Sequence, residues 1–500
     1  MTRFVLAIDQ GTTSTRAIIF DVEGKIHASA QKEHRQIFPR AGWIEHDPEE
    51  IWLITREVVG LALARGEITA RDLAAVGIAN QRETTIIWDR KSGKPIYNAI
   101  VWQDVRTQDI CDVLAQDGGV DRYRSRVGLP LATYFAAPKM RWILDHVPGA
   151  QASAENGELA AGTIDSWLLW HMTGGPDGGI HATDVTNASR TMLFDLHKLE
   201  WDSDIAADFG VPLEILPRVH SSSEIYGYGR HGGLLPDVPI SGILGDQHAA
   251  TVGQTCFERG SVKNTYGTGN FLLVNTGAEA ITSSSGLLTT LAYQFADQPA
   301  VYALEGSIAV TGSLVQWLRD NLDLFNTAGQ IEGLARSVPD SGGAYFVPAF
   351  SGLFAPYWRP DARGALVGLT SYVNKAHIAR AALEATAFQT RDVLQAVQAD
   401  TEVEFSELRV DGGMVENELL LQFQADILGI DVVRPQIAET TALGAAYAAG
   451  LAVGFWANVS DVVQNWQEDR RWHPQMRAAE QADRYRTWQK AVEKSLGWVE

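Results

Sequence analysis

Residues 9–16 read Asp9-Gln10-Gly11-Thr12-Thr13-Ser14-Thr15-Arg16 and lie between two short apolar runs, 4–8 and 17–20. Such runs around a turn rich in Gly and Thr predict a buried strand, a polar turn and a second strand. The glycine lets the backbone approach a ligand, the hydroxyls can donate to phosphate oxygens, and the arginine suits planar contact with phosphate. The leading aspartate is a usual tether for hydrated Mg²⁺. These parts favour a phosphoryl-transfer site; the alternative is an ordinary hairpin turn rich in Thr and Ser.

The composition is that of a large acidic protein. Its 500 residues suit two large domains or three smaller ones, with more than one core. Hydrophobic residues make up 45% of the chain, as in ordinary soluble globular proteins, and the formal net charge is −20. This charge is unfavourable for binding a nucleic-acid backbone or an anionic membrane, so we expect neither as a main partner.

Targeting signals and cysteine usage indicate a reducing compartment. No apolar run approaches the ~18 residues that a membrane span needs, so we expect no membrane insertion. The first apolar run is too short for a signal peptide and ends at Asp9. Cys111 and Cys256 are far apart in sequence and predict neither a disulfide framework nor a zinc site. A cytoplasmic location fits these features best.

The first half of the chain alternates between predicted strands and helices. Asp47 and Pro48 predict the N-cap and first residue of a helix that runs to about residue 64, and the runs 73–79 and 84–88 predict buried strands. Further helices are expected at 138–146 and 162–172. The stretch 221–239, rich in Gly and Pro, is expected to be a loop. This alternation is typical of an α/β architecture.

The second half begins as the first does. A predicted strand at 261–265, a turn at 266–270 and a strand at 271–275 repeat the opening element, which indicates a second domain on the same plan. A long amphipathic helix at 374–397 follows, and then alternating strands and helices between residues 408 and 453. We expect the polar tail from residue 461, which is rich in tryptophan, to pack on the surface or at a subunit contact.

Glycine-rich turns are the strongest nucleotide signal. No Walker A loop is present, and the Gly-x-G-x-x-Gly at 227–232 lacks a buried strand before it and a helix after it, so it is interpreted as a loop. Three other Gly-rich turns, at 9–16, 266–271 and 411–417, each follow a predicted strand. Backbone N–H groups at such turns can hold phosphate oxygens. Three of them in a duplicated α/β chain favour a nucleotide bound between two domains.

Asp246 is the candidate general base. It follows the apolar run 240–244 and Gly245, so the backbone can bring its carboxylate close to a substrate hydroxyl. The alternative is a helix N-cap, and one aspartate can serve both purposes.

Polar groups also stand beside aromatic residues at 80–84, 102–104 and 133–135. This mixture is typical of a polyol pocket, although each stretch alone also fits a salt bridge or a core aromatic.

Four stretches together resemble the FGGY family of carbohydrate kinases: 9–16, Asn80-Gln81-Arg82-Glu83-Thr84-Thr85, Gly245-Asp246-Gln247 and Tyr266-Gly267-Thr268-Gly269. The resemblance covers essentially the whole chain. It includes the family's signatures around 139–146 and from 364 to 384, and it departs at Ala136. It implies an α/β fold of two actin-like, ribonuclease H-type domains that flank a central cleft. Residues 1–250 would form the polyol and phosphate side, and residues 251–500 the adenosine side.

The resemblance also implies an activity and its residues. ATP, with Mg²⁺, would phosphorylate glycerol to sn-glycerol 3-phosphate, the first step of glycerol utilisation, with Asp246 as catalytic base. Glycerol would be held by Arg82, Glu83, Trp102, Tyr134, Asp246 and Phe271, with Gln247 nearby. ATP would lie against Thr12, Thr13, Ser14, Arg16, Thr268, Gly312, Gln316, Gly413 and Asn417. Asp9 and Asp246 would orient Mg²⁺, largely through water. A homo-oligomer, a dimer or a tetramer, is also expected.

The resemblance does not assign a regulator. Some relatives bind fructose 1,6-bisphosphate through a Gly-rich loop bearing an Arg, and others are activated by phosphorylation of a His in this loop. In the matching loop, 226–239, Asp237 stands where that Arg is expected and His231 is out of register with the phosphorylated His. The sequence therefore assigns neither control.

Three other functions are compatible with parts of this sequence. Another kinase of the same family could act on xylulose, gluconate or ribulose, but Arg82, Glu83 and Trp102 favour a small triol. An actin-like ATPase that works as a chaperone or filament subunit would need no small-substrate pocket. A ligand sensor without catalysis is disfavoured because every expected catalytic residue is present.

Overall fold

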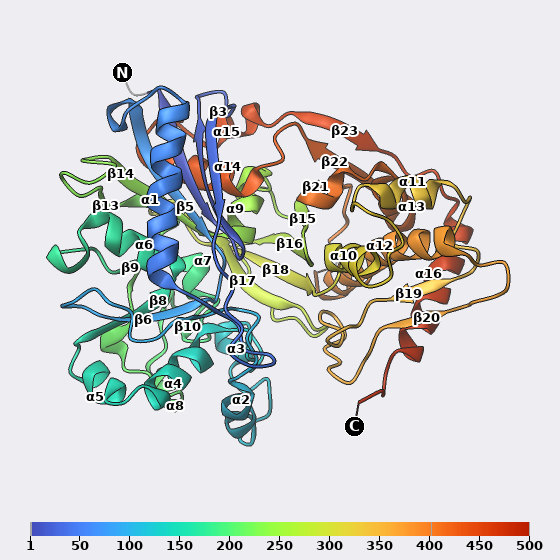
Figure 1. Ribbon diagram of the computed structural model, residues 1–500, viewed down its shortest axis with the longest axis horizontal. Coiled ribbons are helices and arrows are strands. Elements are labelled where there is room, and N and C mark those ends of the chain that lie inside the picture. The colour runs from blue at the N-terminus through green and yellow to red at the C-terminus, as the bar shows by residue number, and fades with distance from the viewer. Residues whose placement is uncertain (1–2, 402, 500) are drawn as a thin grey trace.

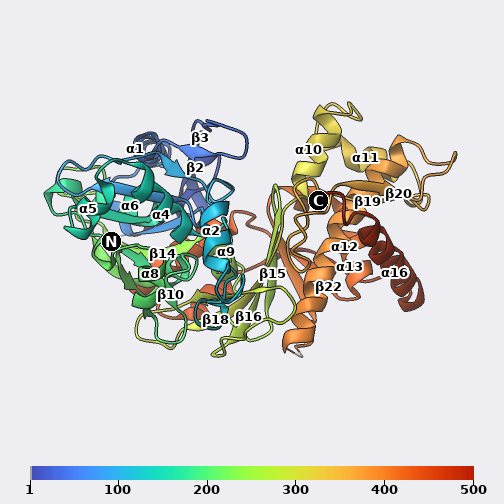
Figure 2. The same ribbon diagram turned by 90° about the horizontal axis from the view of Figure 1, so that it is seen from below.

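The computed structural model describes residues 3–401 and 403–499. It has two lobes, one from the N-terminal half of the chain and the other mainly from the C-terminal half (Figures 1 and 2). The first lobe contains a six-stranded sheet in the order β13-β14-β5-β1-β2-β3. Its strands are β1 (Phe4–Gln10), β2 (Ser14–Phe20), β3 (Ile26–Glu33), β5 (Leu73–Asn80), β13 (Ser223–Tyr228) and β14 (Pro239–Gly245). β1 and β2 are antiparallel and place Asp9 opposite Arg16, so the predicted strand, turn and strand are confirmed.

The second lobe contains a seven-stranded sheet in the order β17-β18-β16-β15-β21-β22-β23. Its strands are β15 (Val262–Tyr266), β16 (Asn270–Gly277), β17 (Leu288–Tyr293), β18 (Val301–Ile308), β21 (Glu407–Asp411), β22 (Asp431–Pro435) and β23 (Glu468–Trp472). β15 pairs antiparallel with β16 and parallel with β21, as β1 pairs with β2 and β5 in the first lobe. The predicted repetition of the opening element is therefore present.

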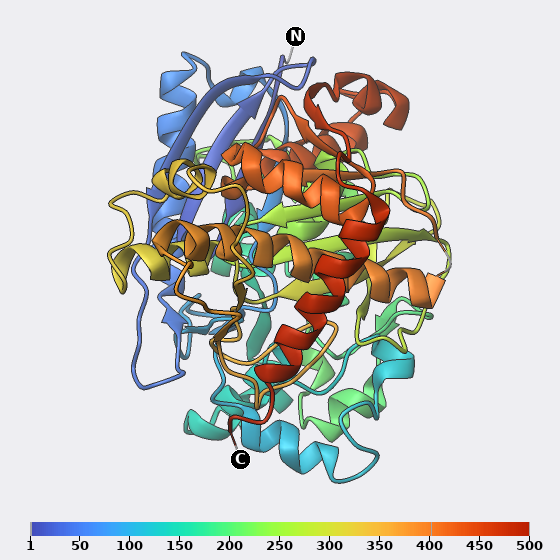
Figure 3. The same cartoon turned by 90° about the vertical axis from the view of Figure 1, so that its right-hand side faces the viewer.

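Helices cover both sheets. α1 (Pro48–Arg65) packs on β2 and β3, and the Asp47 side chain caps it by accepting from the N–H groups of Glu49 and Glu50. In the second lobe α12 (Lys375–Thr401) and α13 (Glu418–Leu428) pack on the sheet, and α16 (Ala478–Lys494) packs on the outer side of these helices (Figure 3, orange to red). No helix in the described part of the chain is long and apolar enough to cross a membrane.

The other elements are mostly short. The remaining helices are α2 (Gln108–Ala115), α3 (Arg124–Val127), α4 (Ala136–His146), α5 (Ala150–Glu155), α6 (Ile164–Thr173), α7 (Val185–Ala188), α8 (Ser203–Asp208), α9 (Asp246–Gly253), α10 (Gly312–Asp320), α11 (Gln330–Arg336), α14 (Thr440–Ala452) and α15 (Val459–Asn465). The remaining strands are β4 (Glu45–His46), β6 (Thr85–Asp89), β7 (Ala99–Ile100), β8 (Leu159–Thr163), β9 (Ala182–Asp184), β10 (Phe194–Asp195), β11 (Glu200–Trp201), β12 (Arg218–His220), β19 (Tyr345–Val347) and β20 (Ala365–Val367).

Helices α9 and α14 join the two halves of the chain. α14 comes from the C-terminal half, yet it packs on β5 and β14 of the first sheet and against α9. Glycines allow this approach: a Cβ atom added at Gly444 would lie 1.8 Å from the carbonyl oxygen of Ala249, and one at Gly253 would lie 2.0 Å from that of Thr440. The backbones touch here, so α14 is held firmly on the lobe that carries Asp246.

Gly444→Ala should destabilise the protein strongly. Overpacking a rigid contact costs about 3 kcal/mol, and here the clash is with backbone that cannot rotate away. Thermal unfolding should show a lower melting temperature. Gly333→Ala is the matched control, because Gly333 also lies in a helix but has open space at its Cβ position. Equal melting temperatures for the two variants would contradict the tight α9–α14 contact.

Three expectations about local structure were wrong or incomplete. The stretch 221–239 is not all loop, because β13 forms an edge strand whose mixed, half-exposed side chains give no apolar run. The helix expected at 162–172 begins two residues later, since β8 extends to Thr163. The tail tryptophans are not mainly at the surface: Trp456, Trp472 and Trp488 are buried, and the ring of Trp488 stacks on that of Phe388.

Candidate functional site

The turn between β1 and β2 gathers acidic groups around one arginine. Arg16 Nη1 lies 2.7 Å from Glu439 Oε2 and 3.9 Å from Asp9 Oδ2. Burial raises the pKa of Asp9 to about 7; Arg16 opposes this rise, while Glu439 and Asp246 add to it. Glu439 precedes α14 and was missed by sequence reasoning. This part of the site would therefore gain from a bound cation.

Asp246 is the first residue of α9 and follows β14 directly. Gly245 is the N-cap, so the interpretation of Asp246 as N-cap is wrong by one residue, and the Asp246 carboxylate instead accepts from the N–H of Gln247 at 2.7 Å. Its side chain is 28% exposed, and its Oδ1 lies 3.1 Å from Arg82 Nε. A Cβ atom at Gly245 would lie 2.7 Å from the Arg82 side chain, so glycine is needed for this approach. Asp246 thus presents an accessible carboxylate beside a buried arginine.

Arg82 and Glu83 belong to a buried network of four charges. Arg82 donates to both carboxylate oxygens of Glu305, at 2.5 and 3.1 Å. Arg190 Nε donates to Glu83 at 2.7 Å, and Arg190 Nη2 donates to Glu305 at 3.4 Å. Burial opposes ionisation of Glu305, but Arg190 and Arg82 together hold the pKa of Glu305 well below its ordinary value. Two positive and two negative groups therefore balance in the interior, and sequence reasoning missed Arg190 and Glu305.

The three predicted aromatic residues come together, although they are distant in sequence. The Trp102 ring lies 5.6 Å from that of Tyr134 and 6.1 Å from that of Phe271, measured between centroids, in edge-on arrangements. Phe271 is on β16, so both lobes contribute. Trp102 Nε1 also donates to Thr12 Oγ1 at 2.9 Å, which ties the aromatic wall to the turn at 9–16. Such walls suit the carbon backbone of a polyol.

The predicted nucleotide residues of the second lobe line one cavity of about 540 Å³. They are Thr268, Gly312, Gln316, Gly413 and Asn417. Val315, Ile331 and Met414 add apolar surface, which suits a flat base. Asn417 also caps α13 by accepting from the N–H of Leu420. In the first lobe Thr12 and Thr13 occupy the turn after β1, and Ser14 begins β2, where its Oγ accepts from Gln31 at 3.0 Å.

The donor set for a metal ion is sparse. Within residues 3–401 and 403–499, no group of three or more His, Cys, Asp or Glu side chains is arranged to hold a metal ion. Asp9 and Asp246 provide two carboxylates, which suits an ion that keeps most of its water and also binds phosphate, as Mg²⁺ does. The described cysteines, Cys111 and Cys256, are free and buried.

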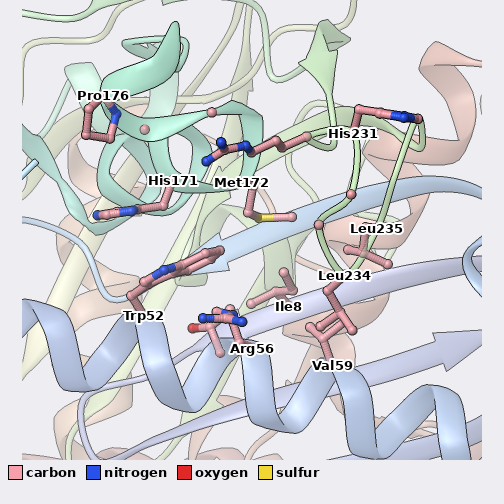
Figure 4. A pocket seen from close by; sticks show the side chains of 16 residues that line it. Ile8, Trp52, Arg56, Val59, His171, Met172, Pro176, His231, Leu234 and Leu235 are labelled. Carbon is pink, nitrogen blue, oxygen red and sulfur yellow. The ribbon is translucent and has the colours of Figure 1, made fainter.

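A second cavity of about 410 Å³ lies beside α1, between the end of α6 and the loop 229–238 (Figure 4). Trp52 and Arg56 of α1 line one side, and His231 and Leu234 of the loop line another, with the His231 ring turned outward. Its lining contains none of the residues predicted to bind the polyol, the nucleotide or the metal. The loop that bounds this cavity is part of residues 226–239, to which the sequence analysis assigns no regulator.

Comparisons with known proteins match both halves of the chain to one family. The model of the FGGY family of carbohydrate kinases, N-terminal domain, matches residues 4–253, and the C-terminal domain model matches residues 262–453. The chain is 66% identical over 500 residues to the glycerol kinase of Beutenbergia cavernae, covering 100% of this chain and 99% of that protein. It is 65% identical over 498 residues to the glycerol kinase of Clavibacter michiganensis subsp. michiganensis, covering 100% of this chain and 99% of that protein.

Solved structures share the fold. The Plasmodium falciparum glycerol kinase with ADP superposes with a TM-score of 0.91 at 36% identity, over 99% of this chain and 98% of that chain. A xylulose kinase from Lactobacillus acidophilus gives a TM-score of 0.85 at 22% identity, over 98% of this chain and 96% of that chain, a likeness of fold alone. The expected actin-like pair of domains is confirmed.

Proposed function

Because the chain belongs to the FGGY family of carbohydrate kinases, we propose that it transfers the γ-phosphoryl group of ATP to glycerol, giving ADP and sn-glycerol 3-phosphate. The full-length relatives at 62–66% identity are named glycerol kinases. The observation that carries the proposal is the accessible carboxylate of Asp246, held 3.1 Å from Arg82 beside the aromatic cluster. This reaction would begin the use of glycerol by the cell.

We assign the binding residues on the same basis. The glycerol site comprises Arg82, Glu83, Trp102, Tyr134, Asp246, Gln247 and Phe271. The ATP site comprises Thr12, Thr13, Ser14, Arg16, Thr268, Gly312, Gln316, Gly413 and Asn417.

We place the domain boundary at residue 250, with the polyol and phosphate side before it and the adenosine side after it. The sequence also supports a cytoplasmic homo-oligomer, a dimer or tetramer, which light scattering can test.

The chemistry follows from these positions. The carboxylate of Asp246 accepts the proton of the terminal glycerol hydroxyl as its oxygen attacks the γ-phosphorus, and the bond from phosphorus to the bridging oxygen of ADP breaks. Arg16 and the turn at 9–16 offset charge on the transferring group. Asp9 and Asp246 would hold Mg²⁺ through water, and the bound ion would supply positive charge at the phosphates. Trp102 and Phe271 come from different lobes, so closure of the lobes would exclude competing water.

Consumption of ATP, with and without a panel of acceptors, tests the proposal. Glycerol should give the highest kcat/KM, with sn-glycerol 3-phosphate as product, over xylulose, ribulose and gluconate. A pentulose preferred over glycerol would overturn the substrate assignment. Hydrolysis of ATP that does not depend on any acceptor would favour an actin-like ATPase instead.

Mg²⁺ affinity should depend on pH through Asp9. Burial places the pKa of Asp9 at about 7, so the group is mostly protonated at pH 6 and ionised at pH 8. Since the cation needs the ionised form, its affinity for the ATP-bound protein should fall by about tenfold from pH 8 to pH 6. Isothermal titration would measure this, after correction for the pH dependence of Mg²⁺ binding to free ATP. Asp9→Asn should remove the extra pH dependence; a corrected affinity that is constant in the parent protein would contradict a role for Asp9.

A further inference from the structure

Two buried lysines adjoin the residues assigned to glycerol, and the proposed chemistry uses neither. The side chains of Lys139 and Lys263 are both 0% exposed. Within the described chain, neither ammonium group forms a salt bridge with a carboxylate. A buried ammonium group is costly unless hydrogen bonds replace its water, so the partners of these two groups show what they hold in place.

Lys139 holds the turn that carries Tyr134. Its Nζ donates to three consecutive backbone carbonyl oxygens, those of Thr133 at 2.6 Å, Tyr134 at 2.7 Å and Phe135 at 2.9 Å. These residues directly precede α4, on which Lys139 lies. All three donors of the ammonium group therefore bind the backbone that carries the Tyr134 ring. This ring contacts the Trp102 ring edge-on.

Lys263 holds two other residues that are assigned to glycerol, Gln247 and Phe271. Its Nζ donates to Gln247 Oε1 at 2.6 Å, to Thr265 Oγ1 at 2.9 Å and to the carbonyl oxygen of Phe271 at 3.3 Å. Gln247 follows Asp246 on α9 of the first lobe, whereas Lys263 and Phe271 lie on β15 and β16 of the second. One ammonium group thus joins the helix that bears the base to the strand that bears an aromatic wall.

Burial of both lysine side chains disfavours their charged forms and so costs folding free energy. Burial lowers the pKa of Lys139 to about 7 and that of Lys263 to about 8. An apolar side chain would avoid this cost but would leave the carbonyl and amide oxygens of the pocket walls without donors. The bonds that each lysine makes converge on residues assigned to glycerol, and this convergence separates them from lysines that only support the fold.

We propose that Lys139 and Lys263 are positioning residues that fix the Tyr134 wall and the Gln247–Phe271 wall of the polyol pocket at the spacing of a three-carbon polyol. They do not touch the reacting atoms; they act through Tyr134, Gln247 and Phe271. This inference rests on the proposed phosphorylation of glycerol.

Steady-state kinetics of Lys139→Met and Lys263→Met test the inference. Each variant should raise the glycerol KM by at least about tenfold, because the walls lose their alignment, while the KM for ATP stays within about twofold. Lys32→Met, at an exposed position, is the matched control and should leave the glycerol KM unchanged. Asp392→Asn controls for lost stability, because its carboxylate binds Tyr485 and Trp488 in the core of the second lobe. It should lower the melting temperature without changing the glycerol KM.

A double-mutant cycle distinguishes positioning from general support of the fold. In a Tyr134→Ala background, Lys139→Met should raise the glycerol KM by less than about twofold, because the group that it aligns is already gone. Phe271→Ala should likewise reduce the effect of Lys263→Met. Fully additive effects, or a KM at the parental value in the single variants, would overturn the positioning roles.

Two further outcomes are distinguishable. If a Met variant does not fold, the Gln variant at the same position, which keeps two donors, decides: a raised glycerol KM supports the inference and a parental KM overturns it. If the parent protein shows no glycerol-dependent turnover, the proposed function fails and the inference fails with it. Parental turnover with unchanged KM in the variants overturns the inference alone.

Discussion

Asp246→Asn should lower turnover with glycerol by about 10³- to 10⁴-fold, with ATP affinity close to that of the parent protein. Asparagine has nearly the same shape, and its amide oxygen can keep the contact with Arg82 Nε, now 3.1 Å from the carboxylate. It cannot take up the hydroxyl proton at neutral pH. The loss should therefore fall on kcat rather than on nucleotide binding.

Single-turnover kinetics and titration with ADP would separate these effects. Asp400→Asn is the control, because the Asp400 carboxylate lies outside the assigned site and accepts hydrogen bonds from the serines at 283–285. That variant should turn over at the parental rate. Near-parental turnover of Asp246→Asn would exclude Asp246 as the general base.

Glu305→Gln, which removes the charge of this buried carboxylate, should lower the free energy of unfolding strongly. It leaves Glu83 as the one buried carboxylate of the network for Arg82 and Arg190, with the partly exposed Asp246 beside Arg82, so positive charge in the interior is poorly compensated, at a cost of about 3–5 kcal/mol. Arg82 would keep at most one of its two bonds to residue 305, because the amide NH₂ cannot accept, and its orientation toward Asp246 would be held less firmly. A large fall in melting temperature and a raised glycerol KM are both expected.

An exposed ion pair provides the comparison for Glu305. Glu57 pairs with Lys32 at 2.6 Å, but both side chains are about half exposed, so Glu57→Gln should cost less than about 1 kcal/mol. Thermal unfolding measures the melting temperatures of Glu305→Gln and Glu57→Gln under the same conditions. Similar melting temperatures would mean that the buried network does not stabilise the protein as inferred.

Local patterns predicted most of the fold because local chemistry determines those elements. The apolar runs on both sides of residues 9–16 formed β1 and β2, and Asp47 with Pro48 marked the start of α1. The edge strand β13 escaped because an edge strand needs only one buried face, and its polar, half-exposed residues resemble a loop. Of the buried tryptophans, Trp488 was not predicted because the polar residues around it concealed the buried face of α16.

Residues of the site that act through distant partners could not be predicted in the same way. Glu305 is 223 positions from Arg82, and Glu439 is 423 positions from Arg16, so no local spacing joins them. One signal was available: Glu305 is a lone carboxylate inside the otherwise uncharged strand Val301–Ile308, and a buried charge requires a partner. The partners of Glu305 are Arg82 and Arg190, and they can be identified only in the folded structure.

The central claim is that Asp246 faces the hydroxyl of glycerol that is to be phosphorylated. A crystal structure of the ternary complex with glycerol and a non-hydrolysable ATP analogue tests it most directly. We predict a carboxylate oxygen of Asp246 within about 3.2 Å of a terminal glycerol oxygen, with the γ-phosphorus on the other side of that oxygen. A glycerol molecule bound elsewhere, or bound with its terminal hydroxyls turned away from Asp246, would contradict the account.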